Sequence, residues 1–131
     1  MRKEFEEKLK ADFSNLYKDL YGDPKKTCLA RGIETKDGWF ELIYDLSKKL
    51  EKIIITFPEN ERYNYRVNQC KEKFGSLRFY LNKYTNEMTE LICGAEQRSC
   101  NLCEWCGKSA TLKQNSNHWF HTICQTCELL K

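Results

Sequence analysis

Two short cysteine pairs near the C-terminus constrain the fold of this chain more than any other feature of its sequence. Each pair has the pattern C-x-x-C, the first at Cys103 and Cys106 and the second at Cys124 and Cys127, with 17 residues between them. Two thiolates three residues apart in a tight turn can both bind one ion at about 2.3 Å, and two such turns complete a tetrahedron. This spacing is typical of structural zinc sites. The sequence therefore predicts one structural zinc ion bound by these four cysteines.

The residues around the two pairs predict a small zinc-ribbon-like module over residues 101–131. Gly107 directly follows the first pair, where a knuckle turn often needs a positive φ. Residues 108–123 would form the hairpin between the knuckles, with Trp119 and Phe120 as its packing residues. Structural zinc contributes roughly 10 to 16 kcal/mol to the folding of finger peptides. We therefore expect this module not to fold without its ion.

Other uses of the cysteines and histidines are weaker interpretations. A disulfide or redox pair is disfavoured because no βαβ pattern flanks the C-x-x-C sequences. An iron–sulfur cluster could use the C-x2-C-x2-C run that begins at Cys100, but the Cys-Pro of the bacterial motif does not follow. A site that includes His118 and His121 has gaps too short for a two-Cys two-His finger. We expect the histidines to lie at the surface or beside the metal ligands without binding the ion, Cys100 to close a helix, and the remaining cysteines to be small buried residues: Cys28, Cys70 and Cys93.

The predicted site is not suited to catalysis. Four thiolates fill the tetrahedral shell of zinc and leave no position at which water could be activated. The H-x-E sequence of zinc deaminases is absent, as are the Walker A, G-x-S-x-G and H-E-x-x-H motifs. A zinc-supported nuclease would need a carboxylate near the histidines, and residues 107–123 contain none. We expect a protein that is not an enzyme, with such a nuclease as the catalytic alternative.

Hydrophobic periodicity predicts helices and one hairpin before the zinc module. Apolar residues at steps of three and four indicate amphipathic helices over residues 2–21, 37–57 and 86–100, with Asp37 as the N-cap of the second. Residues 63–82 have the alternation of a β-hairpin that turns at Gly75. We expect an α+β fold in three parts: an N-terminal amphipathic helix (1–24), a core of helices packed on a small antiparallel sheet (25–100), and the zinc-binding module (101–131).

The predicted hairpin is the basic part of the chain. Residues 1–60 carry 12 basic and 12 acidic side chains, whereas residues 62–83 carry six basic side chains against Glu72 alone. We expect Phe74 in the core and Arg78 paired with Glu72 across the strands. A solvated sheet face explains such a patch without a function. If the patch binds a partner, the candidate residues are Arg66, Lys71, Lys73, Arg78, Tyr80 and, from the ribbon, Trp119.

Four strings of residues carry a further signal. They are T-C-L-A-R-G-I-E at 27–34, D-G-W-F-E-L-I at 37–43, K-E-K-F-G-S-L-R-F-Y at 71–80, and Ala95-Glu96 leading into C-E-W-C-G at 103–107. Together they resemble a family of small proteins found mainly in bacteriophages and prophages, with K-E-K-F-G-x-L-R-F-Y as the most specific part. The chain departs from the family pattern at Asn117-His118-Trp119, where the family often has Gly-Trp. The resemblance implies a mobile-element origin and a zinc knuckle, but no mechanism.

These observations favour a non-catalytic, zinc-stabilised binding protein of phage type. We expect it to engage a host protein or protein–nucleic acid complex, and inhibition of a host defence system in the manner of an anti-CRISPR protein is one such role. The alternatives are a nucleic-acid-binding accessory or regulatory protein and a purely structural or assembly role. The N-terminus lacks the apolar stretch of a signal peptide, and no apolar run approaches the roughly 20 residues of a membrane span. We therefore expect no membrane partner and a location in the cytoplasm of a bacterial host cell.

Overall fold

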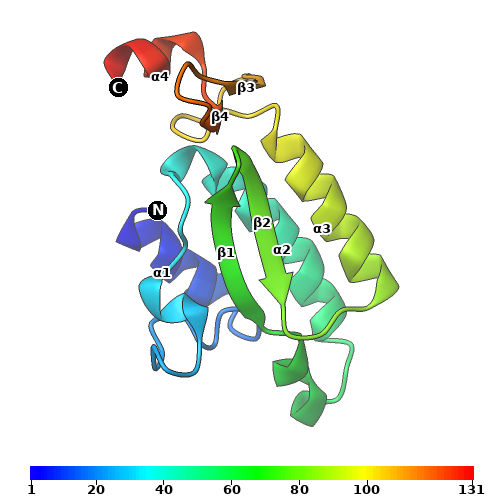
Figure 1. Cartoon of the computed structure of the whole chain (residues 1–131). Coiled ribbons are helices and arrows are strands. Elements are labelled where there is room, and N and C mark those ends of the chain that lie inside the picture. The colour runs from blue at the N-terminus through cyan, green and yellow to red at the C-terminus, as the bar shows by residue number, and fades with distance from the viewer.

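The computed structural model describes all 131 residues of the chain as an α+β fold with two small antiparallel sheets (Figure 1). The fold class expected from the sequence is confirmed. None of the helices combines the length and the hydropathy that crossing a membrane requires. The elements in chain order are α1 (Lys3–Asp12), α2 (Phe40–Ile54), β1 (Val67–Lys73), β2 (Ser76–Leu81), α3 (Asn86–Ser99), β3 (Leu112–Gln114), β4 (Phe120–Thr122) and α4 (Gln125–Leu130), with 3-10 turns at Cys28–Arg31, Asp37–Trp39 and Glu59–Tyr65.

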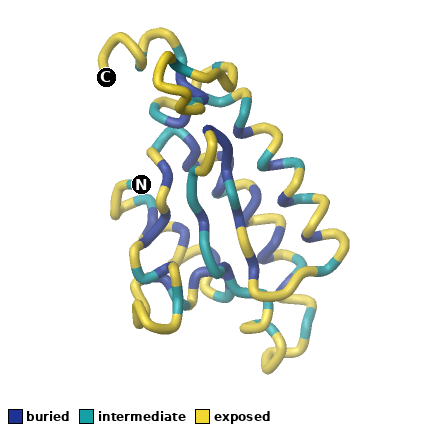
Figure 2. Tube along the Cα trace, in the orientation of Figure 1, coloured by how far each residue is buried: buried dark blue, intermediate teal, exposed yellow.

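The β1–β2 hairpin has one covered face and one open face. Helix α3 packs along β2, and α2 packs against α3 on the same side of the hairpin (Figure 1). Alternate side chains of a strand point to opposite faces, so Cys70, Leu77 and Phe79 are buried against these helices. Glu34 lies at the free edge of β1, where its N–H donates to the carbonyl oxygen of Cys70 at 2.9 Å. Figure 2 shows buried residues along the inner sides of these elements and mainly exposed residues at the C-terminal end.

The N-terminal helix is shorter than the sequence predicts. Helix α1 ends at Asp12, although apolar side chains beyond it are buried as its periodicity requires. The N–H groups of Asn15 and Leu16 donate to the carboxylate of Glu51 at 2.9 and 3.2 Å, and the carbonyl oxygen of Leu16 accepts the N–H of Val67 at 2.8 Å. These tertiary hydrogen bonds satisfy backbone groups that a longer helix would have satisfied internally.

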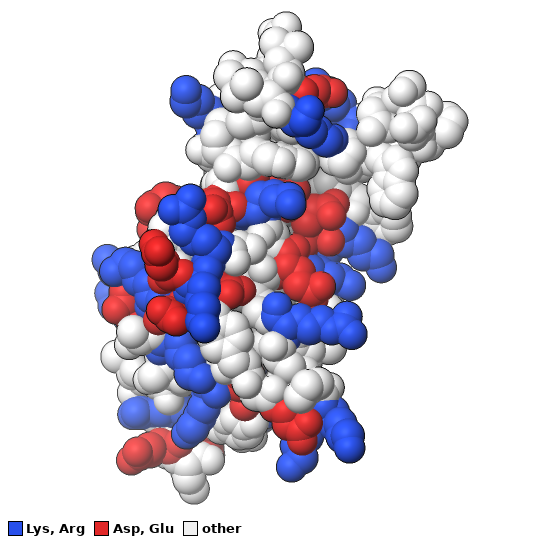
Figure 3. Space-filling model, turned by 90° about the vertical axis from the view of Figure 1, so that its left-hand side faces the viewer, with Lys and Arg blue, Asp and Glu red and all other residues white.

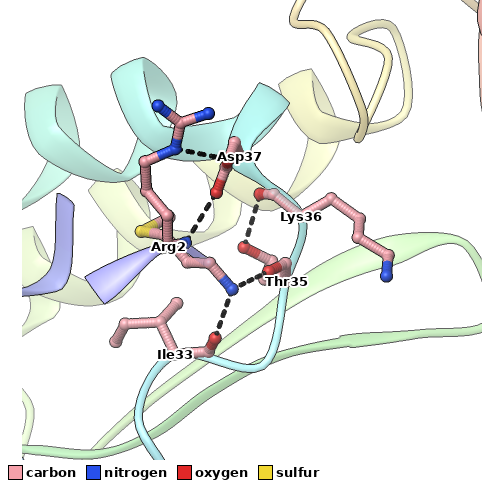
Figure 4. Close-up of polar contacts among 6 residues, drawn as sticks. Arg2, Ile33, Thr35, Lys36 and Asp37 are labelled. Atoms are coloured by element: carbon pink, nitrogen blue, oxygen red, sulfur yellow. Dashed lines mark hydrogen bonds and ion pairs between the residues drawn. The ribbon is translucent and has the colours of Figure 1, made fainter. Parts of the chain in front are cut away.

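The prediction that Asp37 caps the second helix is wrong. Helix α2 begins at Phe40, after the Asp37–Trp39 turn, and no side chain caps it. The carboxylate of Asp37 instead accepts the backbone N–H of Arg2 at 2.7 Å and its Nε–H at 2.9 Å (Figure 4). The amino group of Met1 also donates to two carbonyl oxygens of the 33–35 segment. These hydrogen bonds hold the first two residues against the segment that leads into α2. Helix α2 ends at Ile54.

Two expectations for the hairpin are wrong. Phe74 and Gly75 form its turn with positive φ values of 54° and 83°, as a tight two-residue turn requires. Phe74 therefore lies beyond the last inward position of either strand, and it is 64% exposed. Arg78 does not pair with Glu72, because the register places Arg78 opposite Lys71. The carboxylate of Glu72 accepts the N–H of Gly75 at 2.7 Å and so helps to fix the turn.

Candidate metal centre

The four cysteines of the two C-x-x-C pairs come together at the end of the molecule that carries β3, β4 and α4 (Figure 1). Their Sγ atoms all lie within 4.8 Å of one another, and those of Cys106 and Cys124 are 3.6 Å apart. A tetrahedral ion with bonds of about 2.3 Å to sulfur holds its ligand atoms about 3.8 Å apart. The group of Cys103, Cys106, Cys124 and Cys127 could therefore hold one metal ion such as zinc, and no histidine or carboxylate belongs to it.

The two cysteine pairs are held in different local structures. In the first pair, the N–H of Gly107 donates to the carbonyl oxygen of Cys103 at 2.8 Å, and Gly107 has the expected positive φ of 82°. The second pair begins helix α4, where the Sγ of Cys124 accepts the N–H of Cys127 at 3.4 Å. Because this turn continues into a helix, it does not need the glycine that closes the first knuckle. This explains why Glu128, and not a glycine, follows the second pair.

The thiols of the cluster differ in how readily they ionise. Burial opposes ionisation of Cys103, but backbone hydrogen bonds from Cys124, Cys106 and Trp105 outweigh it and lower the pKa of this thiol to about 7. Burial and the neighbouring cysteine sulfur atoms raise the pKa of Cys127 to about 12. The backbone around Cys103 thus stabilises its thiolate, whereas the sulfur atoms packed around Cys127 disfavour a second negative charge. A divalent ion held between the four sulfur atoms would remove this conflict, because a coordinating thiol is deprotonated outright.

The first knuckle is packed tightly against the turn before α2. The N–H of Gly38 donates to the carbonyl oxygen of Glu104 at 2.7 Å, and the N–H of Lys36 donates to the carboxylate of Glu104 at 3.0 Å. The indole N–H of Trp39 donates to the carbonyl oxygen of Leu102 at 2.9 Å. A Cβ on Gly38 would lie 2.3 Å from the carbonyl oxygen of Cys103. Only glycine therefore allows this approach of the two backbones.

The tip of the β1–β2 hairpin contacts the same module from another side. The hydroxyl of Thr122 donates to the carbonyl oxygen of Gly75 at 2.8 Å. A Cβ on Gly75 would meet the Cδ1 of Leu112 at 2.4 Å and the backbone N of His121 at 3.0 Å. The D-G-W, K-E-K-F-G and C-E-W-C-G strings therefore meet in space around the cysteine cluster. The first knuckle is held against the core at Gly38, and the β3–β4 hairpin is held against it at Gly75.

The histidines lie outside the sulfur cluster. His118 is exposed in the β3–β4 turn with a φ of 65°, and the half-buried ring of His121 lies 6.1 Å from that of Trp105. The expectation that Trp119 and Phe120 pack the ribbon is wrong, since they are 67% and 38% exposed. The short strands β3 and β4 have too few residues to enclose a core of their own, so these rings face outward. They line a hollow of about 430 Å³ together with Glu72, Lys73, Phe74 and His118.

The remaining cysteines do not all lie where the sequence predicts. Cys70 is buried on the inner face of β1, as expected, and burial raises the pKa of its thiol. Cys100 is half-buried just after α3, with its Sγ 3.8 Å from the carbonyl oxygen of Glu96. Cys28 and Cys93 are exposed, which corrects the prediction that they are small core residues. Spacing on an amphipathic element decides burial, and neither residue occupies an inward position.

The candidate partner residues of the hairpin differ in how free they are. The Nε of Arg66 lies 3.1 Å from the carboxylate of Asp19, without the alignment of a hydrogen bond, and its guanidinium stacks 4.2 Å from the ring centre of Tyr63. Arg66 is therefore committed within the fold. The other three cationic candidates form no ion pair: Lys71, Lys73 and Arg78. The two aromatic candidates, Tyr80 and Trp119, are 39% and 67% exposed.

Sequence reasoning missed two residues that position the cluster, Glu104 and Gly38. Glu104 is 6% exposed, and burial raises the pKa of its carboxyl group. A charged residue between two closely spaced cysteines would be expected to face solvent, and nothing in the neighbouring sequence shows that its carboxylate accepts the backbone N–H of Lys36. The D-G-W and C-E-W-C-G strings can be recognised in the sequence, but the sequence does not show that Gly38 of the first contacts Glu104 of the second.

No protein-family model, no curated protein and no solved structure matches this chain. The resemblance to small phage proteins therefore stays a prediction that rests on the four strings.

Proposed function

We propose that this chain is a non-catalytic, zinc-stabilised binding protein that engages a host protein through the end of the molecule that carries the cysteine cluster. The observation that supports this most is the concentration of exposed apolar side chains there. Apart from tyrosines, seven large hydrophobic residues are exposed, and all except Ile55 belong to the zinc module or the hairpin turn: Phe74, Leu112, Trp119, Phe120, Leu129 and Leu130. Exposed aromatic residues grouped in this way are typical of interaction sites.

The metal in this proposal is one zinc ion bound by Cys103, Cys106, Cys124 and Cys127. Four sulfur ligands at this spacing suit zinc, and a filled tetrahedron leaves the ion a structural role. The ion holds β3, β4 and α4 in place, although these elements bury few side chains of their own. It thereby presents Trp119 and Phe120 as fixed groups, which reduces the entropy lost when a partner binds.

The surroundings of the cluster support a protein partner over a nucleic acid. Figure 3 shows basic and acidic side chains intermixed over the N-terminal elements, and mainly uncharged atoms at the end with the zinc module. The formal net charge of the chain is only +3. Nucleic-acid binding depends mainly on phosphate neutralisation by Lys and Arg, so an end with few charged side chains fits a protein partner better.

The biological setting follows from the resemblance to phage proteins. A small phage protein without a catalytic site works by binding, and its target would be a component of the bacterial host. Inhibition of a host defence system, in the manner of an anti-CRISPR protein, is the specific role we propose for that binding, in the cytoplasm of the host cell.

The experiment is an affinity capture from bacterial lysate with the zinc-loaded chain as bait. We expect one or a few proteins to be retained in the presence of a nuclease and to be lost when Trp119→Ala and Phe74→Ala are combined. Ile55→Ala is the matched control, since Ile55 is also exposed but lies at the end of α2. Equal retention by the wild-type and double-variant baits would contradict the proposal.

A nucleic-acid-binding accessory or regulatory protein is the second candidate function. The observation that favours it is the set of three basic side chains on the open hairpin face without an ion-pair partner, Lys71, Lys73 and Arg78. Binding through phosphates would weaken steeply between about 50 and 200 mM salt. Capture that is sensitive to nuclease and abolished by Lys71→Glu with Lys73→Glu would establish this alternative in place of the first.

A further inference from the structure

We infer that the partner surface continues from the aromatic hollow onto the open face of the hairpin, and that it fits an acidic protein segment with an apolar anchor. The surface is formed by Phe74 and Trp119 at one end and by Lys71, Lys73 and Arg78 beside them. This inference rests on the proposed binding function and specifies the chemistry of the partner.

The apolar anchor site is the hollow at the hairpin tip. Phe74 and Trp119 are 64% and 67% exposed, and both line a cavity of about 430 Å³ with Phe120. The hollow lies between two parts of the chain that are fixed to each other, because the hydroxyl of Thr122 donates to the carbonyl oxygen of Gly75 at 2.8 Å. A pocket with rigid aromatic walls suits one large apolar side chain of a partner.

The cationic part of the surface begins within the same hollow. Lys73 lines it, with its Nζ 5.4 Å from the centre of the Phe74 ring. Lys71 lies two residues back along β1, and alternate residues of a strand share one face about 7 Å apart. Arg78 stands directly opposite Lys71 on β2. An extended partner segment anchored in the hollow would therefore pass over all three cations.

The pairing of Lys71 with Arg78 is unfavourable in the isolated chain. Like charges directly opposite each other on antiparallel strands are destabilising, and neither side chain forms an ion pair within 4.0 Å. The carboxylates held near this part of the sheet include those of Glu34, whose backbone bridges to Lys71, of Glu72, which accepts the N–H of Gly75, and of Glu96, which accepts the N–H of Phe79 at 3.0 Å. None of these three forms an ion pair with the cations. A carboxylate supplied by a partner would relieve this repulsion, which is the charge complementarity that selects an acidic segment.

The arrangement favours a protein segment over a nucleic-acid strand. Only part of the basic sequence of residues 62–83 faces outward as free charge, because Arg62 donates to the carbonyl oxygens of Phe57 and Ile55 and Arg66 lies against Asp19. Three cations beside one hollow match a few carboxylates around a single anchor. A nucleic-acid groove would need a longer row of cations that follows the backbone.

The test is a selection of random displayed peptides on the full-length, zinc-loaded protein, followed by affinity measurements on the enriched peptides by fluorescence anisotropy. We expect the enriched sequences to combine an aromatic or large aliphatic residue with several Asp or Glu residues. Lys71→Glu with Lys73→Glu should weaken their binding about tenfold or more and reduce its salt dependence. Trp119→Ala should weaken binding by a similar factor. The control is Lys48→Glu with Lys49→Glu, an equal charge change on exposed residues of α2, which should leave binding unchanged.

Several results would overturn the inference. These are enriched peptides that are neutral or basic, enrichment that is equal on the Trp119→Ala bait, or tighter binding of a single-stranded oligonucleotide of about 20 nucleotides through the same residues. If the Lys71→Glu with Lys73→Glu variant loses its zinc, the salt dependence of peptide binding to the wild-type protein serves as the test in its place. A wild-type affinity that does not change with salt would refute the role of the three cations. A host protein that is captured through Trp119 but docks by a neutral or basic segment would refute this inference and leave the proposed function intact.

Discussion

Replacing Gly38 by alanine tests whether the zinc module is packed rigidly against the core. A Cβ at this position would lie 2.3 Å from the carbonyl oxygen of Cys103 and 2.5 Å from that of Glu104. Non-bonded carbon and oxygen atoms normally stay more than about 3 Å apart, so the first knuckle would have to move by about 1 Å. Both oxygen atoms belong to the backbone, and no side-chain rotation can relieve the overlap.

The size of the effect follows from the contacts that such a shift would weaken. They are the hydrogen bonds from Gly38 N–H to the carbonyl oxygen of Glu104 (2.7 Å), from Lys36 N–H to the carboxylate of Glu104 (3.0 Å), and from the Trp39 indole to Leu102 (2.9 Å). Each contributes about 0.5 to 1.5 kcal/mol to stability. We therefore expect Gly38→Ala to lower the free energy of unfolding by about 2 to 4 kcal/mol.

The assay is urea unfolding followed by circular dichroism, with zinc content measured on the same samples. Gly94→Ala is the matched control, because a Cβ there meets only the Nη1 of Arg98 at 3.4 Å and Gly94 lies within α3. This control should stabilise the protein by about 0.5 to 1 kcal/mol, since alanine favours the helix. A Gly38→Ala protein within about 0.5 kcal/mol of the wild type would refute the reasoning.

Cys127→Ser should release the metal and unfold residues 101–131, as shown by metal analysis and amide hydrogen exchange, whereas the exposed Cys93→Ala should keep the metal and change stability by less than about 0.5 kcal/mol. Metal loss from Cys93→Ala would show that the ligand set is wrong. Replacing His118 and His121 together by alanine should leave zinc affinity unchanged in a chelator competition, and a fall by orders of magnitude would indicate a mixed site. Burial raises the pKa of Glu51 above its usual 4.5. The contribution of Glu51 to the free energy of unfolding is therefore fully present below its pKa in the unfolded chain, and it is lost as the pH rises through its pKa in the folded protein. Glu51→Gln should therefore gain stability relative to the wild type in urea unfolding as the pH rises above the unfolded pKa and through the folded pKa of Glu51, and a difference that is constant with pH would contradict this sign.

The features that the sequence predicts well are those that short-range patterns determine. The spacing of Cys103, Cys106, Cys124 and Cys127 identifies the group that could hold a metal ion, because each pair is one tight turn. The alternation in β2 identifies the hairpin, whose turn at Gly75 needs a positive φ. Each C-x-x-C turn and each strand alternation is complete within a few residues, so it can be recognised without knowledge of distant contacts.

The errors of prediction come from contacts between residues far apart in sequence. Asp37 has the position of a helix cap, but Arg2 supplies two donors to its carboxylate. Apolar periodicity continues beyond Asp12, but the helix ends there because Glu51 accepts the backbone N–H groups that follow. Periodicity reports which residues are buried, and not which backbone groups find helical partners.

The exposed aromatic residues were the hardest to predict. An aromatic side chain in a strand or turn is usually part of a core, and the sequence predicts packing roles for Phe74, Trp119 and Phe120, although Trp119 is also a candidate partner residue. They are exposed because the module has strands of three residues and relies on the cysteine cluster instead of a core. The same residues form the hollow on which the proposed function depends.

The most direct test of the account is X-ray absorption spectroscopy at the zinc edge of the purified protein. The account predicts one zinc ion per chain with four sulfur neighbours at about 2.3 Å and no lighter ligand, because a closed four-thiolate site supports structure without catalysis. A nitrogen or oxygen neighbour at about 2.0 to 2.2 Å would contradict the closed site and restore an open position for chemistry. A protein that contains iron in place of zinc would contradict the account of the metal itself.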